Sequence, residues 1–165
     1  MATTTSKPAI LGGELSITLD QTQANDWPII STEDEQAVLD VLRSGELSTN
    51  PVVSELENDY KKLTGRKFAL THNNGTSAIL AGLHALGISP MDEVIVPSAT
   101  WWSSVMPVLH CGGIPVFAEL ENERLGLDPQ DIEKKITPRT KAIVVVHLFG
   151  MPSRIDEIQA VADKH

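Results

Sequence analysis

The chain has 165 residues, of which 41% are apolar and 21% charged, a balance typical of a globular protein with one core of ordinary size. Its formal net charge of -9 and its lack of a basic cluster argue against a broad surface for nucleic acid or anionic membranes. No apolar run reaches the roughly 20 residues of a membrane-spanning helix, and the first eight residues contain no hydrophobic signal core. We therefore expect a soluble, cytoplasmic protein.

The cysteine and histidine content gives no indication of a metal site. The single cysteine, Cys111, excludes an intramolecular disulfide, and its apolar context favours a buried structural thiol. His72, His84 and His110 show no ligand spacing with acidic residues or with Cys111. We therefore expect no bound metal.

The N-terminal residues 1–26 are expected to form an arm, because Gly12 and Gly13 interrupt their only apolar patch and no periodicity is sustained. The domain proper is predicted to cover residues 27–165. Its first helix is predicted to start at Ser31, where capping hydroxyls precede acidic residues, and to end at Gly45. A second helix is predicted from about residue 52 to 63.

Predicted strands and helices alternate from residue 67 onward, which implies right-handed crossovers and an α/β fold, a three-layer sandwich with a mainly parallel sheet. The strands are expected at 67–71, 93–98, 114–118 and 142–149, and the helices at 76–86, 101–111, 128–136 and 155–165. Pro107 is expected to destabilise the interior of its helix. The most apolar run, 142–149, predicts a mid-sheet strand covered on both faces. Because no strand follows the last helix, we expect the chain to be part of a longer one.

The Asn73–Ala78 turn joins a predicted strand to a predicted helix, and it contains one glycine and two hydroxyl side chains. A helix start combines unpaired backbone N–H groups with the positive end of the helix dipole, which suits a phosphate. The alternative is an ordinary N-cap formed by Asn74, Thr76 or Ser77. The turn has neither the G-x-G-x-x-G pattern of dinucleotide-binding proteins nor a P-loop.

Two further polar or aromatic stretches are expected at the same edge of the sheet, because ligands gather at the carboxyl ends of parallel strands. The first stretch contains Trp101 and Trp102, adjacent indoles in a chain with few aromatic residues. One of them could stack on a flat ring while the other fills the core, although both could be structural. The second is His147, for which a structural role is the simpler interpretation.

Three stretches taken together resemble the DegT/DnrJ/StrS family of PLP-dependent sugar aminotransferases. They are the Asn74–Ala78 turn and the runs 92–101 and 136–150, and Trp27-Pro28 and residues 42–45 are similar to the family's N-terminal segment. The resemblance extends from about Trp27 to the end of the chain. It implies that residues 27–165 are the N-terminal portion of a large domain of the PLP fold-type I architecture.

The resemblance also implies which residues contact pyridoxal 5'-phosphate. Gly75, Thr76 and Ser77 match the positions that bind the phosphate, and Trp101 matches an aromatic residue that stacks on the pyridine ring, which leaves Trp102 for the core. The family's Schiff-base lysine, and the aspartate that pairs with the ring nitrogen, belong to later segments, and no lysine of this chain matches. We therefore expect no catalytic residue in this chain.

The parent protein is accordingly expected to move an amino group from glutamate or glutamine to a keto-sugar or keto-cyclitol, and to be a homodimer. The isolated chain is expected to be inactive. One alternative is a non-catalytic ligand-binding or regulatory fragment of the same fold, or the product of a degraded gene. Another is a nucleotide-binding α/β domain with a different cofactor, which the glycine pattern supports poorly.

Overall fold

The computed structural model describes residues 7–15, 18, 27–48 and 50–165, so most of the predicted N-terminal arm lies outside the described residues. The chain divides into two compact units, Met1–Ser54 and Glu55–His165. The first contains a short 3-10 helix, η1 (Ala9–Leu11), and the helix α2 (Thr32–Ser44). The helix α3 (Pro51–Thr64) crosses the boundary between the two units. No helix in the described part of the chain is long and apolar enough to cross a membrane.

Helix α2 has the ends that its sequence predicts. Asp34 N–H donates to Ser31 Oγ at 3.3 Å, and Ser31 N–H donates to Asp34 Oδ2 at 2.8 Å, which completes a reciprocal capping box. The helix ends at Gly45, whose φ of 74° lies in the left-handed region that glycine adopts without strain. The predicted bounds of this helix are confirmed, because its capping signals are local.

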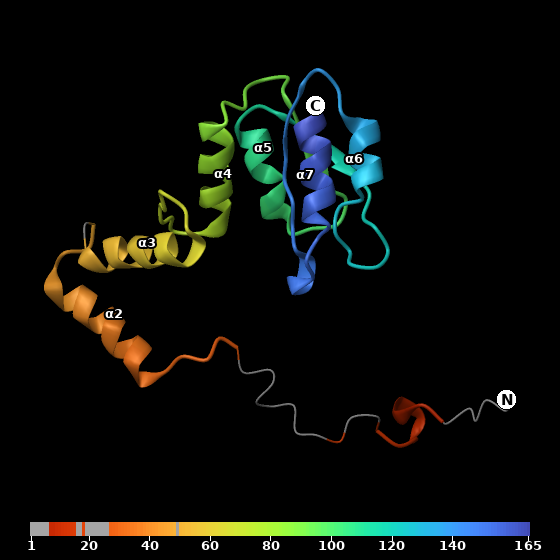
Figure 1. Cartoon of the computed structure of the whole chain (residues 1–165). Helices are drawn as coiled ribbons and strands as arrows, with labels where there is room; N and C mark the ends of the chain where they lie inside the picture. The colour runs from red at the N-terminus through yellow and green to blue at the C-terminus, as the bar shows by residue number, and fades with distance from the viewer. Residues whose placement is uncertain (1–6, 16–17, 19–26, 49) are drawn as a thin grey trace. The chain divides into compact units, whose positions relative to one another are not determined.

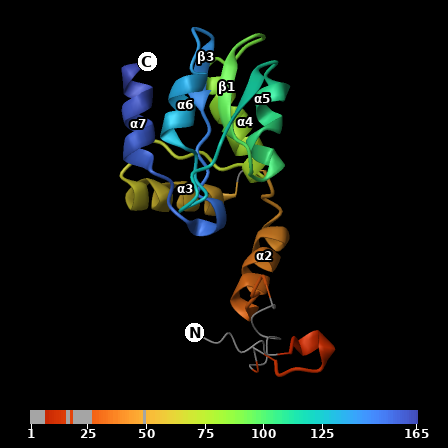
Figure 2. The same cartoon turned by 90° about the vertical axis from the view of Figure 1, so that its right-hand side faces the viewer.

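The second unit contains a three-stranded parallel sheet, which confirms the predicted α/β class (Figure 2). Its strands are β1 (Glu93–Pro97), β2 (Ile114–Ala118) and β3 (Thr140–Ile143), in the order β2-β1-β3. Val94 of the central strand lies opposite Pro115 on one side and Ala142 on the other. Every residue of β1 is buried, as expected for a strand with neighbours on both edges.

Helices cover both faces of this sheet. Helices α4 (Gly75–Ala85) and α5 (Met106–His110) pack on one face, and α6 (Pro129–Lys135) and α7 (Ile155–Lys164) pack on the other (Figures 1 and 2). The alternation of side chains along β1 divides the core between the two faces. Val94 and Val96 pack with Leu83 and Val108, whereas Ile95 packs in the other cluster with Leu127, Ile132 and Ile158. The predicted three layers are therefore present.

The strand predicted at 67–71 does not form in the structure, so that prediction is wrong. Phe68 and Leu70 are 78% and 76% exposed, and no strand in the described residues pairs with this segment. Instead, the end of the segment is tied to α3, because the Thr71 N–H and hydroxyl both donate to Glu57 Oε1, at 2.9 and 3.1 Å. Apolar sequence alone does not make a strand, since a strand requires a partner for its backbone groups.

The strand predicted at 142–149 is shorter than expected and lies at an edge of the sheet, so its predicted mid-sheet position is wrong. β3 ends at Ile143, and a 3-10 helix, η3, occupies Leu148–Gly150. β3 pairs with β1 alone among the described strands, and most of its residues are only partly buried. The central position belongs to β1, because β1 is the strand with partners on both sides.

The helix predicted at 101–111 is divided in two. A 3-10 helix, η2 (Trp102–Ser104), precedes α5, and Pro107 lies in the first turn of α5. A first-turn proline loses no helical hydrogen bond, so Pro107 does not have the predicted cost. Helix α6 agrees with its prediction: Asp128 caps it by accepting a hydrogen bond from Gln130 N–H at 2.9 Å.

Candidate cofactor site

The Asn73–Ala78 turn forms the start of α4, and Asn74 is its N-cap. The backbone of Asn74 is extended, and its Oδ1 accepts a hydrogen bond from Ser77 N–H at 2.8 Å. Its carbonyl oxygen accepts from Ala78 N–H at 3.2 Å. The N–H groups of Gly75 and Thr76 have no acceptor within the described part of the chain. The turn is thus both a capped helix start and a pair of free donors at the positive end of a helix dipole.

Neither the backbone conformation nor the packing of the described residues requires a glycine at position 75. The φ of Gly75 is not positive, so the backbone does not demand glycine. A Cβ built at this position would meet nothing within 4 Å among the described residues. The space that a Cβ of residue 75 would take is therefore open, and a glycine leaves room for a phosphate to approach the backbone closely. This arrangement fits a cofactor phosphate.

Trp101 and Trp102 follow β1 in a loop that lies against α4. The loop is held by a 2.9 Å hydrogen bond between Thr100 Oγ1 and Ser104 Oγ, and Ser104 is buried. The two indoles are 72% and 67% exposed. The expectation that Trp102 fills the core is therefore wrong, because the loop buries Ser104 and leaves both indoles at the surface.

The Trp101 loop and the start of α4 share one hydrophobic cluster. Ile79, in the first half of α4, packs against this cluster, and so does Val105, which directly follows η2. Helix α4 and η2 are also in direct contact. The fold thus brings the loop that contains Trp101 beside the helix that starts with Gly75, Thr76 and Ser77, although the strand predicted before that helix does not form.

His147 is held by a residue that the sequence analysis did not consider. Its Nδ1 accepts a hydrogen bond from the backbone N–H of Ser153 at 3.0 Å, so in the neutral ring the proton belongs on Nε2. Ser153 is buried, and its hydroxyl donates to Val146 O at 2.9 Å. A Cβ on Gly126 would lie 2.7 Å from Ser153 Oγ, which requires a glycine there. The predicted structural role of His147 agrees with this network.

The buried carboxylate of Glu93 lies at the amino end of β1, the end opposite to the one that the Trp101 loop follows. The Thr137 hydroxyl donates to its carboxylate, and the Arg139 guanidinium forms an ion pair with it. These two partners hold the pKa of Glu93 below its ordinary value. Because Glu93 begins β1 whereas Trp101 follows it, this ion pair stabilises the fold and does not belong to the candidate cofactor site. The described residues include no group of three or more His, Cys, Asp or Glu side chains that could hold a metal ion.

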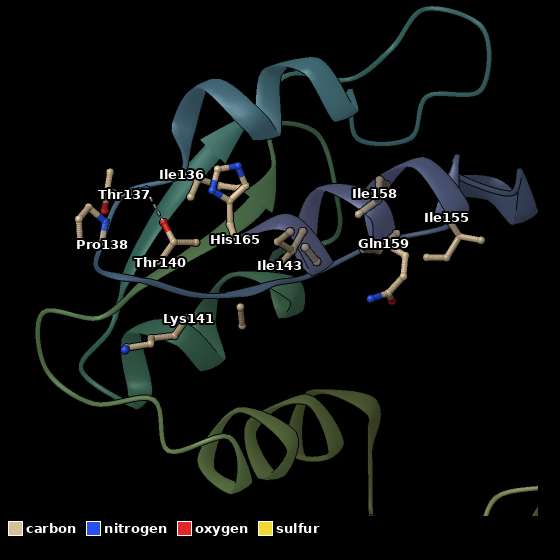
Figure 3. Close-up of a pocket in the computed structure, with 13 residues that line it drawn as sticks. Ile136, Thr137, Pro138, Thr140, Lys141, Ile143, Ile155, Ile158, Gln159 and His165 are labelled. Atoms are coloured by element: carbon tan, nitrogen blue, oxygen red, sulfur yellow. Dashed lines mark hydrogen bonds between the residues drawn. The ribbon is translucent and has the colours of Figure 1, made fainter.

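A groove of about 490 Å³ lies between β3 and α7, and the sequence analysis did not predict it (Figure 3). Its lining includes Ile143, Ile155 and Ile158, but none of the predicted cofactor-binding residues. The groove is therefore a separate feature from the candidate cofactor site.

The parallel three-layer α/β fold is that of the PLP fold-type I aminotransferases, which are the structural neighbours of this chain. The chain belongs to the DegT/DnrJ/EryC1/StrS aminotransferase family, whose model matches residues 28–165. The resemblance inferred from the sequence is thereby confirmed. Thr76, Ser77 and Trp101 all fall within the matched residues.

Individual relatives agree with this assignment. The chain is 41% identical over 138 residues to the spore coat polysaccharide biosynthesis protein SpsC of Bacillus subtilis (strain 168), covering 84% of this chain and 36% of SpsC. The aminotransferase from Psychrobacter cryohalolentis matches with a TM-score of 0.80 and 35% identity over 84% of this chain and 36% of its own. NtdA from Bacillus subtilis, solved with bound cofactor PMP, matches with a TM-score of 0.77 and 32% identity over 82% and 32%. The chain thus spans about a third of the length of these relatives.

Proposed function

We propose that this chain is the phosphate-binding part of a PLP-dependent sugar aminotransferase. The observation that carries the proposal is the start of α4, where the backbone N–H groups of Gly75 and Thr76 have no acceptor among the described residues and the space that a Cβ of residue 75 would take is open. Membership of an aminotransferase family, and a relative solved with bound PMP, support PLP as the ligand. In this proposal residues 27–165 are the N-terminal portion of the enzyme's large domain, and residues 1–26 form an arm.

Four residues of the chain would hold the cofactor. The N–H groups of Gly75 and Thr76 would donate to the phosphate, and the hydroxyls of Thr76 and Ser77 are the nearest side-chain donors in the sequence. The exposed indole of Trp101 would stack on the pyridine ring. Bound PLP supplies an aldehyde that carries an amino group and a ring that accepts electrons. The residues of this chain bind and orient that group.

The proposal for the parent enzyme is transfer of an amino group from glutamate or glutamine to a keto-sugar or keto-cyclitol, in a cytoplasmic homodimer. No lysine adjoins the Asn73–Ala78 turn or the Trp101–Trp102 pair in the sequence. This observation favours a second candidate for the chain by itself, a ligand-binding fragment without catalytic activity. The isolated chain is proposed to bind the cofactor through its phosphate and ring, and to catalyse no transamination.

Binding is tested by titrating the purified chain with pyridoxamine 5'-phosphate, whose amine cannot form a Schiff base with surface lysines. Tryptophan fluorescence is expected to be quenched, and pyridoxamine, which lacks the phosphate, should bind much more weakly. Trp101→Phe should abolish most of the quenching, whereas the matched control Trp102→Phe should retain it. Equal affinity for the two ligands, or undiminished quenching in Trp101→Phe, would contradict the proposed site.

The phosphate donors are tested by the double variant Thr76→Ala and Ser77→Ala. A hydrogen bond to a charged group contributes about 1.5–3 kcal/mol, so affinity should fall at least about tenfold. The proposed inactivity is tested with the chain, PLP, glutamate and a keto-sugar acceptor. Turnover above a blank that contains PLP but no protein would refute it.

A further inference from the structure

The turn between β3 and α7 holds the imidazole ring of His147 in a fixed orientation. The backbone N–H of Ser153 donates to His147 Nδ1 at 3.0 Å, and the Ser153 hydroxyl donates to Val146 O at 2.9 Å. Ser153 is buried, and Gly126 lies so close to it that a Cβ at position 126 would be 2.7 Å from its hydroxyl oxygen. The ring is therefore tied to a residue that the surrounding structure fixes, and it cannot rotate without breaking that hydrogen bond.

The backbone of this turn is strained. Phe149 has a φ of 53°, in the left-handed region that a bulky residue rarely adopts. The Gly150 N–H donates to His147 O at 3.1 Å, and the Met151 N–H donates to Leu148 O at 3.0 Å, which closes the turn around Phe149. Such strain persists only where the surrounding structure imposes it, and it concentrates at ligand sites. The turn therefore has the features of a preorganised binding element.

The fixed ring leaves one hydrogen-bond donor free. Because Nδ1 accepts the Ser153 N–H, the proton of the neutral ring belongs on Nε2. The two nitrogens of an imidazole point in different directions, so the Nε2–H faces away from Ser153. It has no acceptor among the described residues, and the His147 side chain is exposed. The turn thus presents one oriented N–H group to a ligand.

This donor lies at the same rim as the candidate cofactor site. The Val144 N–H donates to Ile95 O at 2.9 Å, so the segment after β3 continues parallel to β1. His147 therefore reaches the carboxyl end of the sheet, where the Trp101 loop follows β1. Val144 also packs against the same hydrophobic cluster as Ile79 of α4. The segment that leads to His147 thus shares its packing with the helix whose start would bind the phosphate.

We propose that His147 Nε2–H donates a hydrogen bond to an anionic oxygen of the ligand at this rim, and that Ser153 and Gly126 position the ring for it. The inference rests on the proposed function, because that function supplies the ligand. Two oxygens have the required charge: the phenolate oxygen on the cofactor ring and a carboxylate oxygen of the glutamate that donates the amino group. Hydrogen bonds to charged oxygens are the strong ones, so an oriented donor contributes substantially to affinity.

The key variant is His147→Asn. Its amide oxygen takes the place of Nδ1 and accepts the Ser153 N–H, but no atom of asparagine reaches the place of Nε2. The variant thus removes the donor and retains the bond that holds the turn. The matched control is His110→Asn, because His110 is an exposed histidine at the end of α5. Urea unfolding should give both variants a stability close to that of the wild type.

Three ligands distinguish the two acceptor oxygens. Pyridoxamine 5'-phosphate carries the ring oxygen, 3-deoxypyridoxamine 5'-phosphate lacks it, and N-(5'-phosphopyridoxyl)-L-glutamate adds the carboxylates. If the phenolate is the acceptor, His147→Asn should bind the first and third ligands about tenfold or more weakly, with unchanged affinity for the second. If a carboxylate is the acceptor, only the glutamate conjugate should bind more weakly. His110→Asn should bind all three like the wild type, as measured by tryptophan fluorescence.

Two results would overturn the role of His147. One is wild-type affinity of His147→Asn for all three ligands, and the other is an equal loss for all three, which would show that His147 only supports the structure of the site. Failure of the proposed function has a different signature, because the wild type would then bind pyridoxamine 5'-phosphate no better than pyridoxamine. That result would remove this inference together with the function on which it rests.

Discussion

Asn74 Oδ1 accepts a hydrogen bond from the backbone N–H of Ser77, at 2.8 Å, at the start of α4. This bond satisfies one of the four N–H groups that begin the helix and leaves those of Gly75 and Thr76 free. The cap therefore orients the helix start without occupying all of its donors. Capping and phosphate binding, which the sequence presents as alternatives, are compatible in this geometry.

Replacement of Asn74 is expected to separate these two roles. Asn74→Ala removes the cap and should lower the free energy of unfolding by about 1 kcal/mol. Asn74→Asp retains a capping oxygen, so its stability should be close to that of the wild type. Its negative charge should nevertheless weaken pyridoxamine 5'-phosphate binding by electrostatic repulsion. Urea unfolding and ligand titration measure the two effects, and unchanged affinity in Asn74→Asp would argue against a phosphate at this turn.

Gly75→Ala tests whether the glycine serves the ligand. Its φ is not positive and its Cβ would meet no described atom, so the substitution should leave stability unchanged or raise it by up to about 1 kcal/mol. The added methyl group should weaken binding of the phosphate because it fills the space that the glycine leaves open.

Gly82→Ala is the matched control for this prediction. Gly82 lies in the interior of the same helix, and a Cβ there also meets nothing within 4 Å. Its stability should rise by up to about 1 kcal/mol, with no change in ligand affinity. If Gly75→Ala and Gly82→Ala bound pyridoxamine 5'-phosphate equally well, Gly75 would have no role in binding.

Ile132→Ala is expected to destabilise the second unit strongly. Ile132 is completely buried in the cluster that contains Ile95 and Leu127. Truncation of a buried isoleucine costs about 2–5 kcal/mol, because it removes apolar contacts and leaves a cavity. Leu86→Ala is the control. Because Leu86 is 67% exposed, its truncation should lower the free energy of unfolding much less. Chemical denaturation measures both, and similar losses would contradict the observed core.

The Glu93 carboxylate is expected to make stability depend on pH in the acidic range. Its partners Thr137 and Arg139 hold its folded-state pKa below the ordinary value of 4.5. The stabilisation is therefore fully present above about pH 4.5, and it is lost as the pH falls through the lowered folded-state pKa. Thermal unfolding from about pH 6 to pH 3 should show a steeper loss for the wild type than for Glu93→Gln.

Glu55→Gln provides the control for the pH measurement, because Glu55 is an exposed residue of α3. The stability of the Glu55→Gln variant should depend on pH in the same way as that of the wild type. A Glu93→Gln profile parallel to that of the wild type would show that the ion pair with Arg139 contributes nothing to the acid sensitivity of the fold.

Much of the candidate site follows from the sequence, because its determinants are local. The cap at Asn74 and the glycine beside it are features of six consecutive residues, and the loop with Trp101 directly follows an apolar run that does form β1. The alternation of elements also predicts that each stretch follows a strand, which holds for Trp101 but not for Asn74, because the strand predicted at 67–71 does not form. Their roles as cofactor ligands remain predictions that the titrations above test.

The sequence by itself determined where α2, α4 and α6 start, and that the fold is a layered α/β structure, because caps and periodicity depend on neighbouring residues. The tertiary structure decided which apolar segments become strands. Phe68 and Leu70 are apolar like the residues of β1. Their side chains nevertheless stay exposed, because no described strand pairs with their segment. The tertiary structure also decided that both Trp101 and Trp102 are exposed, and that the backbone N–H of Ser153 donates a hydrogen bond to His147. Pairing and burial depend on residues far away in the chain, which no local pattern contains.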